Sequence, residues 1–331
     1  MVASDNRENH HPKGSNMSQQ KQPRRTFLTT LGCASGTAFL GTRPSYGVTP
    51  GVGDKMHIAC NEYPWTVFYQ TEKRDFNANL EAGLGEVARS GVQGYEPLAT
   101  SPEQVDHLVS LLKKHNLEMR SLYVNTLLHD PAKAEESIET VLAIAQRASK
   151  TGTTIIVTNP SPIRWGGTEN KDDTQLRLQG TSLEKLGKEL RAMGLTLAYH
   201  NHDIELRKSA REFHHMLAGT DPEYVKFCLD SHWVYRGSGD SSVALFDVVT
   251  LYASRIVEVH LRQSVDGIWS ETFGEGDIDY PALVQKLKEA GVKPHLVLEQ
   301  AVEEGTPRSL DAVESHRRSL EYATRVFAPL A

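Results

Sequence analysis

Short apolar runs alternate with longer amphipathic stretches along this chain from about residue 56 to its end. The runs are typical of buried strands and the stretches of helices, because apolar positions in the stretches recur at the helical period. The eight predicted strands are 56–60, 92–96, 117–125, 153–159, 195–200, 225–230, 255–260 and 295–299. The eight predicted helices lie near 77–90, 101–116, 131–150, 174–194, 209–218, 241–253, 280–290 and 309–327. This strict alternation predicts a parallel sheet in an α/β fold.

The architecture that the chain favours is a single (β/α)8 TIM barrel over residues 55–328. Such barrels have a typical length of about 250 residues, with insertions adding more. An open doubly wound sheet is the alternative, but its Gly-rich turn directly after the first strand is missing here. Local signals agree with the predicted elements, since Ser101 and Pro102 are typical of a helix start at 101–116. Residues 153–159 are nearly all β-branched, as expected for a strand buried on both faces.

Composition narrows the function classes. The 331 residues carry a net charge of −6, which argues against a basic surface that follows nucleic-acid phosphates. The chain has three cysteines, of which Cys60 and Cys228 fall in the predicted barrel. A chain of this size needs no disulfide for stability, so we expect two buried thiols.

Residues 1–50 are predicted to be a disordered N-terminus with an export signal. Arg24 and Arg25 precede the weakly apolar stretch 28–41, a pattern that resembles a twin-arginine signal. That stretch is too short and too rich in Gly and Thr to span a membrane, so we expect no stable membrane insertion after signal removal. The expected location is periplasmic or extracellular. Leu31-Gly32-Cys33 partly matches a lipoprotein signal, but the short apolar stretch before it argues against anchoring at Cys33.

Four polar residues end predicted strands at nearly regular steps: His200, Asp230, His260 and Glu299. The steps are 30, 30 and 39 residues, and one strand–helix unit takes about 30 or more. In a closed barrel these side chains converge on the carboxyl end of the strands, where barrel enzymes have their active sites. Two imidazoles and two carboxylates favour one divalent ion, with Mn²⁺ ahead of Zn²⁺, Co²⁺ or Fe²⁺ and all of these ahead of Ca²⁺.

Neighbouring residues supply further candidates. His202 shares a strand face with His200 and competes with it as the metal ligand, while Arg262 lies on the same side as His260. Glu96, Asn125 and Asn159 close strands two to four and are candidates for binding sugar hydroxyls, although turns and caps use such residues as well. His232, which would share a strand face with Asp230, and Trp233 complete the predicted substrate-binding set. Trp65, Trp165 and Trp269 also follow predicted strands, where they would either stack on a sugar ring or pack within loops.

Six stretches carry a resemblance to a known family: GVQGYEP (91–97), AYHNHDIEL (198–206), VKFCLDSHW (225–233), EVHLRQ (258–263), FGEGDIDYPALVQKLKEAG (273–291) and LVLEQ (296–300). They resemble the sugar phosphate isomerase/epimerase family, which has a xylose isomerase-like TIM barrel and includes inosose dehydratase, ketose 3-epimerases and endonuclease IV. The resemblance covers about residues 55–328. It implies a divalent metal held by Glu, Asp, His and Glu from strands five to eight.

By position, the last three of these ligands fall on Asp230, His260 and Glu299, but the first falls on His200 instead of Glu. In the epimerases two glutamates relay a proton between the faces of the substrate, so this departure makes a lyase or dehydratase a serious alternative. A non-catalytic exported carbohydrate-binding barrel is a second alternative. Endonuclease IV needs more His and acidic metal ligands than this sequence offers, and it also needs a basic groove.

The mechanism expected from these residues passes through an enediolate. The metal polarises a keto-sugar carbonyl, Glu299 or His202 removes the proton next to it, and Arg262 stabilises the charge that develops. The substrate is expected to be a non-phosphorylated keto-sugar or sugar derivative, because the acidic loop 273–279 would repel phosphate. An oligomeric assembly is compatible with the sequence.

Overall fold

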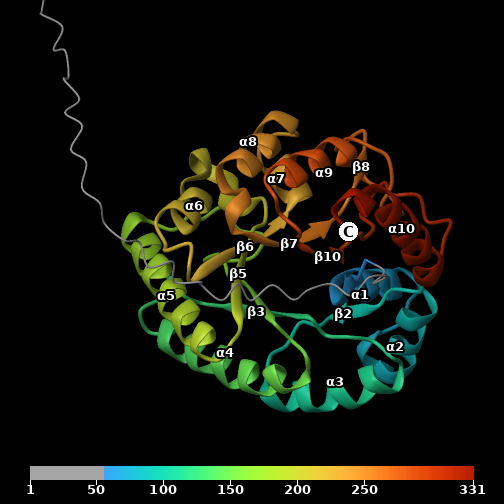
Figure 1. Ribbon diagram of the computed structural model, residues 1–331, viewed down its shortest axis with the longest axis horizontal. Coiled ribbons are helices and arrows are strands. Elements are labelled where there is room, and N and C mark those ends of the chain that lie inside the picture. The colour runs from blue at the N-terminus through green and yellow to red at the C-terminus, as the bar shows by residue number, and fades with distance from the viewer. Residues whose placement is uncertain (1–55) are drawn as a thin grey trace, which may run out of the picture. The chain divides into compact units, whose positions relative to one another are not determined.

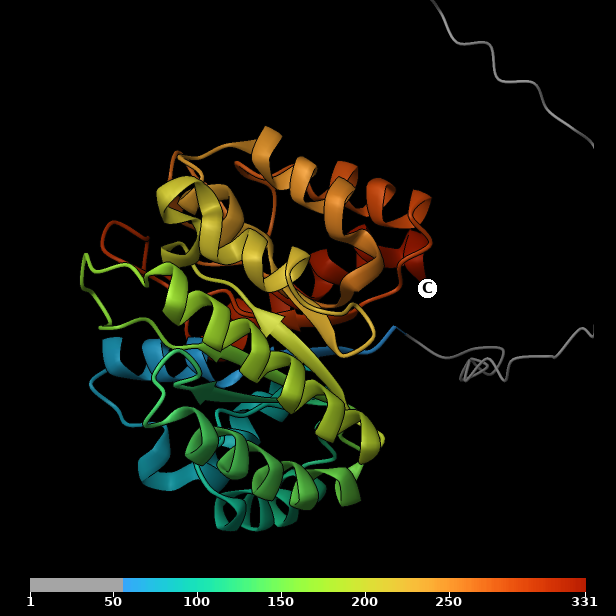
Figure 2. The ribbon, with the colours of Figure 1, turned by 90° about the vertical axis from the view of Figure 1, so that its left-hand side faces the viewer.

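The computed structural model describes residues 56–331. Eight parallel strands form one sheet in the order β2-β1-β10-β7-β6-β5-β4-β3, and helices surround it (Figures 1 and 2). The strands are β1 (Ile58–Asn61), β2 (Gly94–Glu96), β3 (Ser121–Thr126), β4 (Ile155–Pro160), β5 (Thr196–His200), β6 (Val225–Asp230), β7 (Ile256–Leu261) and β10 (His295–Leu298). A short antiparallel pair, β8 (Ser264–Val265) and β9 (Ile268–Trp269), follows β7.

The helices that cover the sheet are α1 (Glu62–Thr71), α2 (Leu80–Arg89), α3 (Pro102–Lys114), α4 (Ala134–Ala148), α5 (Asp173–Ala192), α6 (Arg207–Ala218), α7 (Ser231–Gly237), α8 (Ser242–Tyr252), α9 (Tyr280–Glu289) and α10 (Ala312–Phe327). Five 3₁₀ turns lie between them: η1 (Asn77–Asn79), η2 (Ser149–Thr151), η3 (Ile204–Leu206), η4 (Ala253–Arg255) and η5 (Ala328–Leu330).

The two end strands of the sheet, β2 and β3, meet through isolated bridges instead of a continuous ladder. The amide of Tyr95 donates to the carbonyl of Glu118 (2.9 Å), and the amide of Tyr123 donates to the carbonyl of Pro97 (3.0 Å). The sheet is therefore a nearly closed eight-stranded barrel, and the predicted α/β TIM barrel is confirmed.

Helix ends follow the signals in the sequence. Ser101 accepts a hydrogen bond from the Gln104 amide (3.3 Å) with Pro102 in the first turn of α3, as predicted. Gly152 and Gly194 have φ of +93° and +78° and lead into β4 and β5, which is the left-handed conformation that glycine adopts without strain.

Two helices were not predicted, α1 and α7, and both begin directly after a strand. Asn61 and Asp230 end β1 and β6, and their side chains accept hydrogen bonds from the amides of Tyr63 (2.7 Å) and Trp233 (2.8 Å). Because these polar side chains cap helices at once, the chain turns without the loop that the sequence pattern led us to expect.

The core has two parts. The larger lies between the strands and the helices, and the smaller lies inside the barrel and contains Tyr123, Ile155, Val157, Ala198 and Cys228. Cys60 and Cys228 are both buried and free, so the expectation of two buried thiols is confirmed.

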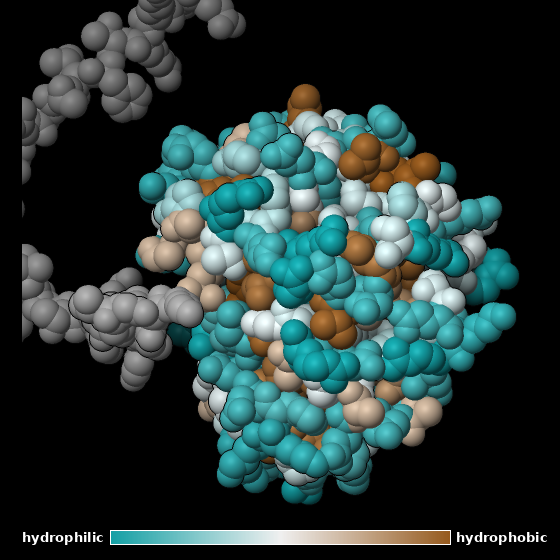
Figure 3. Space-filling model, turned by 90° about the vertical axis from the view of Figure 1, so that its right-hand side faces the viewer, coloured by the Kyte–Doolittle hydropathy of each residue, from teal (hydrophilic) through white to brown (hydrophobic). Residues whose placement is uncertain are grey.

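The face in Figure 3 is mostly hydrophilic, with hydrophobic residues scattered across it. Among the described residues, no helix is long and apolar enough to cross a membrane. The predicted export signal and Cys33 lie outside the described residues.

Candidate metal and sugar site

Four predicted ligands meet at the carboxyl end of the barrel strands. His200, Asp230 and His260 end or nearly end β5, β6 and β7, and Glu299 directly follows β10. Asp230 and His260 are Cα partners in neighbouring strands, so the register alone brings them side by side. One donor atom from each of the four residues lies within 4.8 Å of the other three donors.

The spacing of these donors fits a single cation. The Nδ1 atom of His260 lies 3.1 Å from Oε2 of Glu299, and the Nε2 atom of His200 lies 3.8 Å from Oδ2 of Asp230. Donors that bind one ion at about 2.0–2.2 Å lie about 3–4.4 Å apart. Within the described part of the chain, His200 Nε2 and Asp230 Oδ2 are buried without a hydrogen-bond partner, which is costly unless a ligand satisfies them. The residues present therefore fit a divalent metal ion.

The two histidines at the end of β5 are neutral at physiological pH. Burial lowers the pKa of His200 well below its usual range and the pKa of His202 to about 4, and both remain available as electron-pair donors. The Tyr123 hydroxyl lies 3.4 Å from Nδ1 of His200, which leaves Nε2 to face Asp230. The structure thus places His200 in the four-donor group and His202 beside it, with ring centroids 4.8 Å apart.

The two carboxylates of the group differ in their surroundings. Burial raises the pKa of Asp230 to about 7. Burial also acts to raise the pKa of Glu299, but Arg262 and His260 outweigh it and lower that pKa well below the usual range. Glu299 is therefore ionised, whereas the Asp230 carboxyl would gain most from a bound cation.

A cavity of about 640 Å³ opens beside the four-donor group. His202, Arg262 and Glu299 line it, so all three predicted catalytic residues face the same space. Its walls also carry four aromatic side chains: Tyr63, Tyr123, Trp165 and Trp233. Trp165 is 54% exposed and meets His202 edge to face at 5.1 Å. Flat apolar rings next to a few polar groups are typical of sites for small polar ligands such as sugars.

Arg262 is held tightly at the edge of this cavity. Its guanidinium lies over the rings of Trp269 (4.2 Å) and Trp233 (4.9 Å), and its Nη2 atom lies 3.1 Å from Oε2 of Glu299. Nη1 is buried and has no hydrogen-bond partner among residues 56–331. A donor in this state is suited to an oxygen atom of a bound substrate.

The predicted substrate-binding residues divide into two groups. Asn125 and Trp233 line the cavity. Glu96, Asn159 and His232 are fully buried and do not line it. Their roles in substrate binding stay predictions.

Two of these buried side chains, Asn159 and His232, have local partners that explain their positions. Asn159 Nδ2 donates to the His200 carbonyl (3.1 Å) and to Glu205 Oε1 (3.0 Å), and so supports the segment that carries His202. His232 lies in α7 and its Nε2 pairs with the Ser264 hydroxyl (3.0 Å). The assumption that His232 shares a strand face with Asp230 was wrong, because β6 ends at Asp230.

The tryptophans beyond the predicted strands also divide. Trp165 and Trp233 line the cavity, whereas Trp269 packs on Arg262. Trp65 is fully buried, donates to the Cys60 thiol (3.1 Å) and stacks on His316 at 4.2 Å. The suggestion that Trp65 stacks on a sugar was wrong, because α1 turns it into the core.

Sequence reasoning missed a buried carboxylate below the four-donor group. Glu258 Oε1 lies 3.2 Å from Nε2 of His260, and Glu96 Oε1 lies 3.1 Å from the same nitrogen. The signal was present, since a glutamate two residues before His260 on a buried strand must share its face. A buried charge of this kind is rare without a partner.

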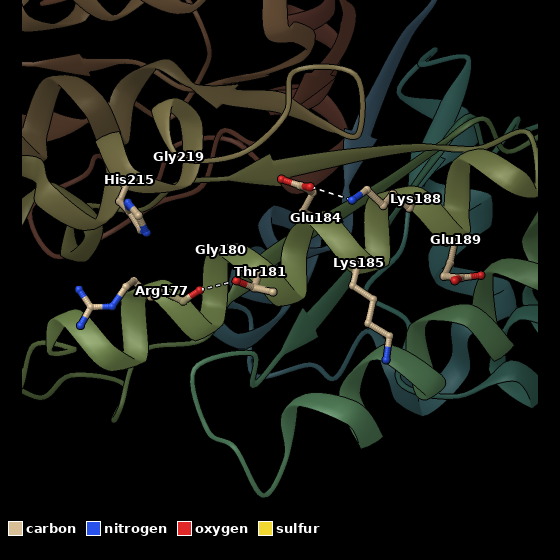
Figure 4. A pocket seen from close by; sticks show the side chains of 9 residues that line it. All are labelled: Arg177, Gly180, Thr181, Glu184, Lys185, Lys188, Glu189, His215 and Gly219. Atoms are coloured by element: carbon tan, nitrogen blue, oxygen red, sulfur yellow. Dashed lines mark hydrogen bonds and ion pairs between the residues drawn. The ribbon is translucent and has the colours of Figure 1, made fainter.

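A second hollow, of about 500 Å³, lies on the outer surface along α5 and beside α6 (Figure 4). Two of its lysines pair with neighbouring carboxylates, Lys188 with Glu184 (2.8 Å) and Lys185 with Glu135 (2.6 Å). It contains none of the candidate ligands, so we place the functional site at the barrel end.

Comparison with known proteins agrees with this geometry. The family described as "Xylose isomerase-like TIM barrel" matches residues 84–323. An inosose dehydratase of Mesomycoplasma hyopneumoniae is 24% identical over 272 residues, which cover 74% of this chain and 87% of the relative.

Three solved structures illustrate the similarity in fold. A sugar phosphate isomerase/epimerase from Parabacteroides distasonis superposes with a TM-score of 0.64 at 16% identity, covering 87% of this chain and 99% of that protein. The 3-keto-D-glucoside 4-epimerase from E. coli superposes with a TM-score of 0.58 at 15% identity, covering 82% of this chain and 99% of that protein. A xylose isomerase-like TIM barrel protein from Mycobacterium smegmatis, solved in complex with magnesium, superposes with a TM-score of 0.62 at 15% identity. The match covers 83% of this chain and 98% of that protein.

Proposed function

Because this chain belongs to the xylose isomerase-like TIM barrel family, we propose that its four-donor group serves a metal-dependent sugar isomerase or epimerase. The observation that carries the proposal is the convergence of His200, Asp230, His260 and Glu299 within 4.8 Å beside an aromatic-walled cavity. Relatives and structural neighbours that include an inosose dehydratase and a 3-keto-D-glucoside 4-epimerase support an activity of the isomerase, epimerase or lyase kind.

A divalent ion bound by these four residues would polarise a substrate carbonyl and make the neighbouring C–H bond acidic. We propose Mn²⁺ first, because mixed imidazole and carboxylate donors suit it, with Zn²⁺, Co²⁺ and Fe²⁺ as alternatives. The protein residues then handle the proton. Glu299 is ionised and His202 is neutral, so each can accept a proton from a carbon held in the cavity.

Arg262 has a separate task. Its unpaired Nη1 donor is placed to stabilise the oxygen that gains charge as the substrate becomes an enediolate. The aromatic walls would hold the sugar ring and exclude water from this step. Return of the proton to the other face or to the neighbouring carbon gives epimerisation or isomerisation.

A lyase or dehydratase is the second candidate. It is favoured by the replacement of a carboxylate by His200 on β5, since a single carboxylate base removes the symmetry that two-sided epimerisation uses. The inosose dehydratase relatives support the same reading. In that case the enediolate would expel a β-oxygen in place of taking back the proton. A non-catalytic sugar-binding barrel is the third candidate, and it predicts neither a bound metal nor turnover.

The experiment that tests the proposal is an NMR screen of non-phosphorylated keto-sugars and 3-keto-glycosides in D₂O with Mn²⁺-loaded protein. We expect solvent deuterium at the carbon next to the carbonyl of one substrate class, and Glu299→Gln should abolish it. Glu304→Gln, which changes an exposed acid in the same loop, is the matched control. Full exchange by Glu299→Gln would remove its role as a base, and a lost hydroxyl in the product would favour the lyase.

We also propose export by the twin-arginine signal at Arg24 and Arg25, which lies outside the described residues. Its support is the sequence pattern alone. Replacement of both arginines by lysine should leave the protein in the cytoplasmic fraction of its native cells, and unchanged export would overturn this proposal.

A further inference from the structure

The imidazole of His260 lies between two layers of carboxylates inside the barrel. On the side of the four-donor group, its Nδ1 atom lies 3.1 Å from Oε2 of Glu299. On the other side, its Nε2 atom hydrogen-bonds to Oε1 of Glu258 (3.2 Å) and lies 3.1 Å from Oε1 of Glu96. Glu96 and Glu258 are fully buried, and neither is among the residues that line the cavity.

A neutral imidazole carries one proton, and a metal ion can bind only the nitrogen without it. Carboxylates accept hydrogen bonds and cannot donate them when ionised. We propose that Glu258, assisted by Glu96, keeps the proton of His260 on Nε2 and thereby presents Nδ1 as the metal ligand. This inference rests on the proposed function, in which the four-donor group holds a divalent ion. Glu258 and Glu96 are then positioning residues that act through His260.

Both carboxylates are fixed from a second direction, which prevents them from rotating away. Oε2 of Glu258 pairs with Nδ1 of His295 (2.9 Å), and Oε1 of Glu96 accepts a hydrogen bond from Nδ2 of Asn61 (2.7 Å). Residues of β1 and β10 therefore hold the two carboxylates that accept from Nε2. These strands lie on one side of β7, and β6 with Asp230 lies on the other. A fixed acceptor below a metal-binding histidine orients the ring and makes the ligating nitrogen more basic.

The same atoms could instead hold a second cation, because Glu96, Glu258 and His260 also bring donor atoms within 4.8 Å of one another. A cation there would bind Nε2, and His260 would have to lose both protons to bind the upper ion as well. A proton on Nε2 satisfies the two carboxylates without that cost. We therefore assign the proton, and the metal content of the protein distinguishes the two arrangements.

The test uses the full chain with ¹⁵N-labelled histidine and Zn²⁺, which is diamagnetic. We expect the ¹⁵N spectrum of the Zn²⁺-loaded protein to show His260 protonated on Nε2, with one Zn²⁺ per chain. Glu258→Gln should bind Zn²⁺ about 10–100-fold more weakly, the usual effect of removing such a partner. Glu258→Asp should recover part of that loss. Glu212→Gln, which changes a carboxylate paired with Lys171, should bind Zn²⁺ like the wild type.

Three results would overturn the inference. The first is wild-type Zn²⁺ affinity in a Glu258→Gln variant whose circular dichroism shows a folded barrel. The second is the His260 proton on Nδ1 in the loaded protein. The third is two Zn²⁺ per wild-type chain and one in Glu96→Gln. If Zn²⁺ binds and only the Glu258 result fails, the proposed function stands; if the wild type binds no Zn²⁺, both fall together.

Discussion

Arg262 lies where one side chain would both contact a bound substrate and repel a bound metal ion. Its guanidinium is buried against the rings of Trp233 and Trp269, and Nη2 lies 3.1 Å from Glu299 Oε2 and 4.0 Å from Asp230 Oδ2. Both of these oxygens are predicted metal ligands. A positive charge so close to them lowers the affinity of any cation that would bind there.

Removal of that charge should tighten metal binding while it slows turnover. Two unit charges 4 Å apart interact by about 4 kcal/mol at an effective dielectric constant of about 20, so we expect Arg262→Gln to bind Mn²⁺ at least about tenfold more tightly. Loss of the Nη1 donor should lower kcat by about 10²-fold or more. Isothermal titration calorimetry and steady-state kinetics measure the two effects.

Arg236→Gln is the matched control for this experiment. Arg236 also stacks on Trp269, at 5.1 Å, but its partner is Glu303 (2.7 Å) and it contacts none of the four donors. It should leave Mn²⁺ affinity within about twofold of the wild type, since it lies away from the donors. If Arg262→Gln binds Mn²⁺ no more tightly than the control, Arg262 does not compete with the cation.

Among the helices, α6 begins in an unusual way. Lys208, Ser209 and Ala210 are consecutive non-glycine residues with φ of 52°, 61° and 55°, so the right-handed helix begins only after them. The left-handed conformation costs about 1–2 kcal/mol for each residue that carries a Cβ. This strained turn follows the segment that carries His202 and Glu205. Its position is therefore set by the contacts on either side and not by local preference.

Ser209→Gly should stabilise the protein, in contrast to the usual effect of glycine in a helix. Ser209 is exposed, and glycine adopts its φ without strain, so we expect a gain of about 0.5–1 kcal/mol after the greater freedom of the unfolded chain is subtracted. Ala143→Gly, at an exposed position within α4, should lose about 1 kcal/mol. Urea unfolding measures both, and a loss of stability in Ser209→Gly would show that the turn is not strained.

Helix α10 carries a histidine that should make stability depend on pH. His316 is fully buried, stacks on Trp65, and donates from Nδ1 to the Ala312 carbonyl (2.7 Å). Burial lowers its pKa from 6.5 to about 4, so the unfolded chain takes up a proton before the folded protein does. The stability that this neutral histidine provides is complete above pH 6.5 and is lost as the pH falls from 6.5 to about 4.

The loss from His316 alone amounts to about 3 kcal/mol, at 1.36 kcal/mol for each pKa unit. His316→Phe keeps an aromatic ring on Trp65 and removes the titrating group, so its free energy of unfolding should fall less steeply over this range. The comparison is between the pH slopes of the two proteins from urea unfolding, not between their stabilities at one pH. Equal slopes would mean that His316 is protonated as readily in the folded protein as in the unfolded chain.

At the scale of the whole molecule, the order of the elements could be predicted because each strand and helix has its own local pattern. The places where prediction failed are places where one side chain has two uses. Asp230 caps α7 with Oδ1 and directs Oδ2 toward His200, so a residue identified as a ligand also starts a helix directly after its strand. Asn61 caps α1 in the same way, and α1 was therefore missed.

The residues of the candidate site that lie at strand ends could be predicted, whereas the residue that lies deeper inside the barrel was missed. Strand spacing brought His200, Asp230, His260 and Glu299 together, because consecutive parallel strands end at the same edge. Glu258 was missed although its spacing from His260 gives it the same strand face, because one strand's sequence does not show which side chains of other strands it meets. Those contacts follow from the register, in which Cys228 and Glu258 are neighbours across β6 and β7.

The interior of the barrel therefore contains more acidic groups than basic ones. Glu96, Asp230, Glu258 and Glu299 are buried there, and Arg262 is the permanent cation that contacts two of them. Burial raises the pKa of Glu96 and of Asp230, which shows that the protein without metal holds these groups at a cost. A divalent ion would offset this excess, so folding and metal binding should be coupled.

This coupling predicts that metal removal lowers the melting temperature of the whole barrel. An ion that binds the folded state adds about 4.1 kcal/mol at a thousand times its Kd, which corresponds to a rise in Tm on the order of 10 °C for a protein of this size. We expect that rise when Mn²⁺ is added to EDTA-treated protein in a calorimetric scan. Asp230→Asn combined with Glu299→Gln should melt at a temperature that does not respond to Mn²⁺, since the two anionic donors are gone. A wild-type Tm that is the same with EDTA and with Mn²⁺ would mean that the four donors hold no ion.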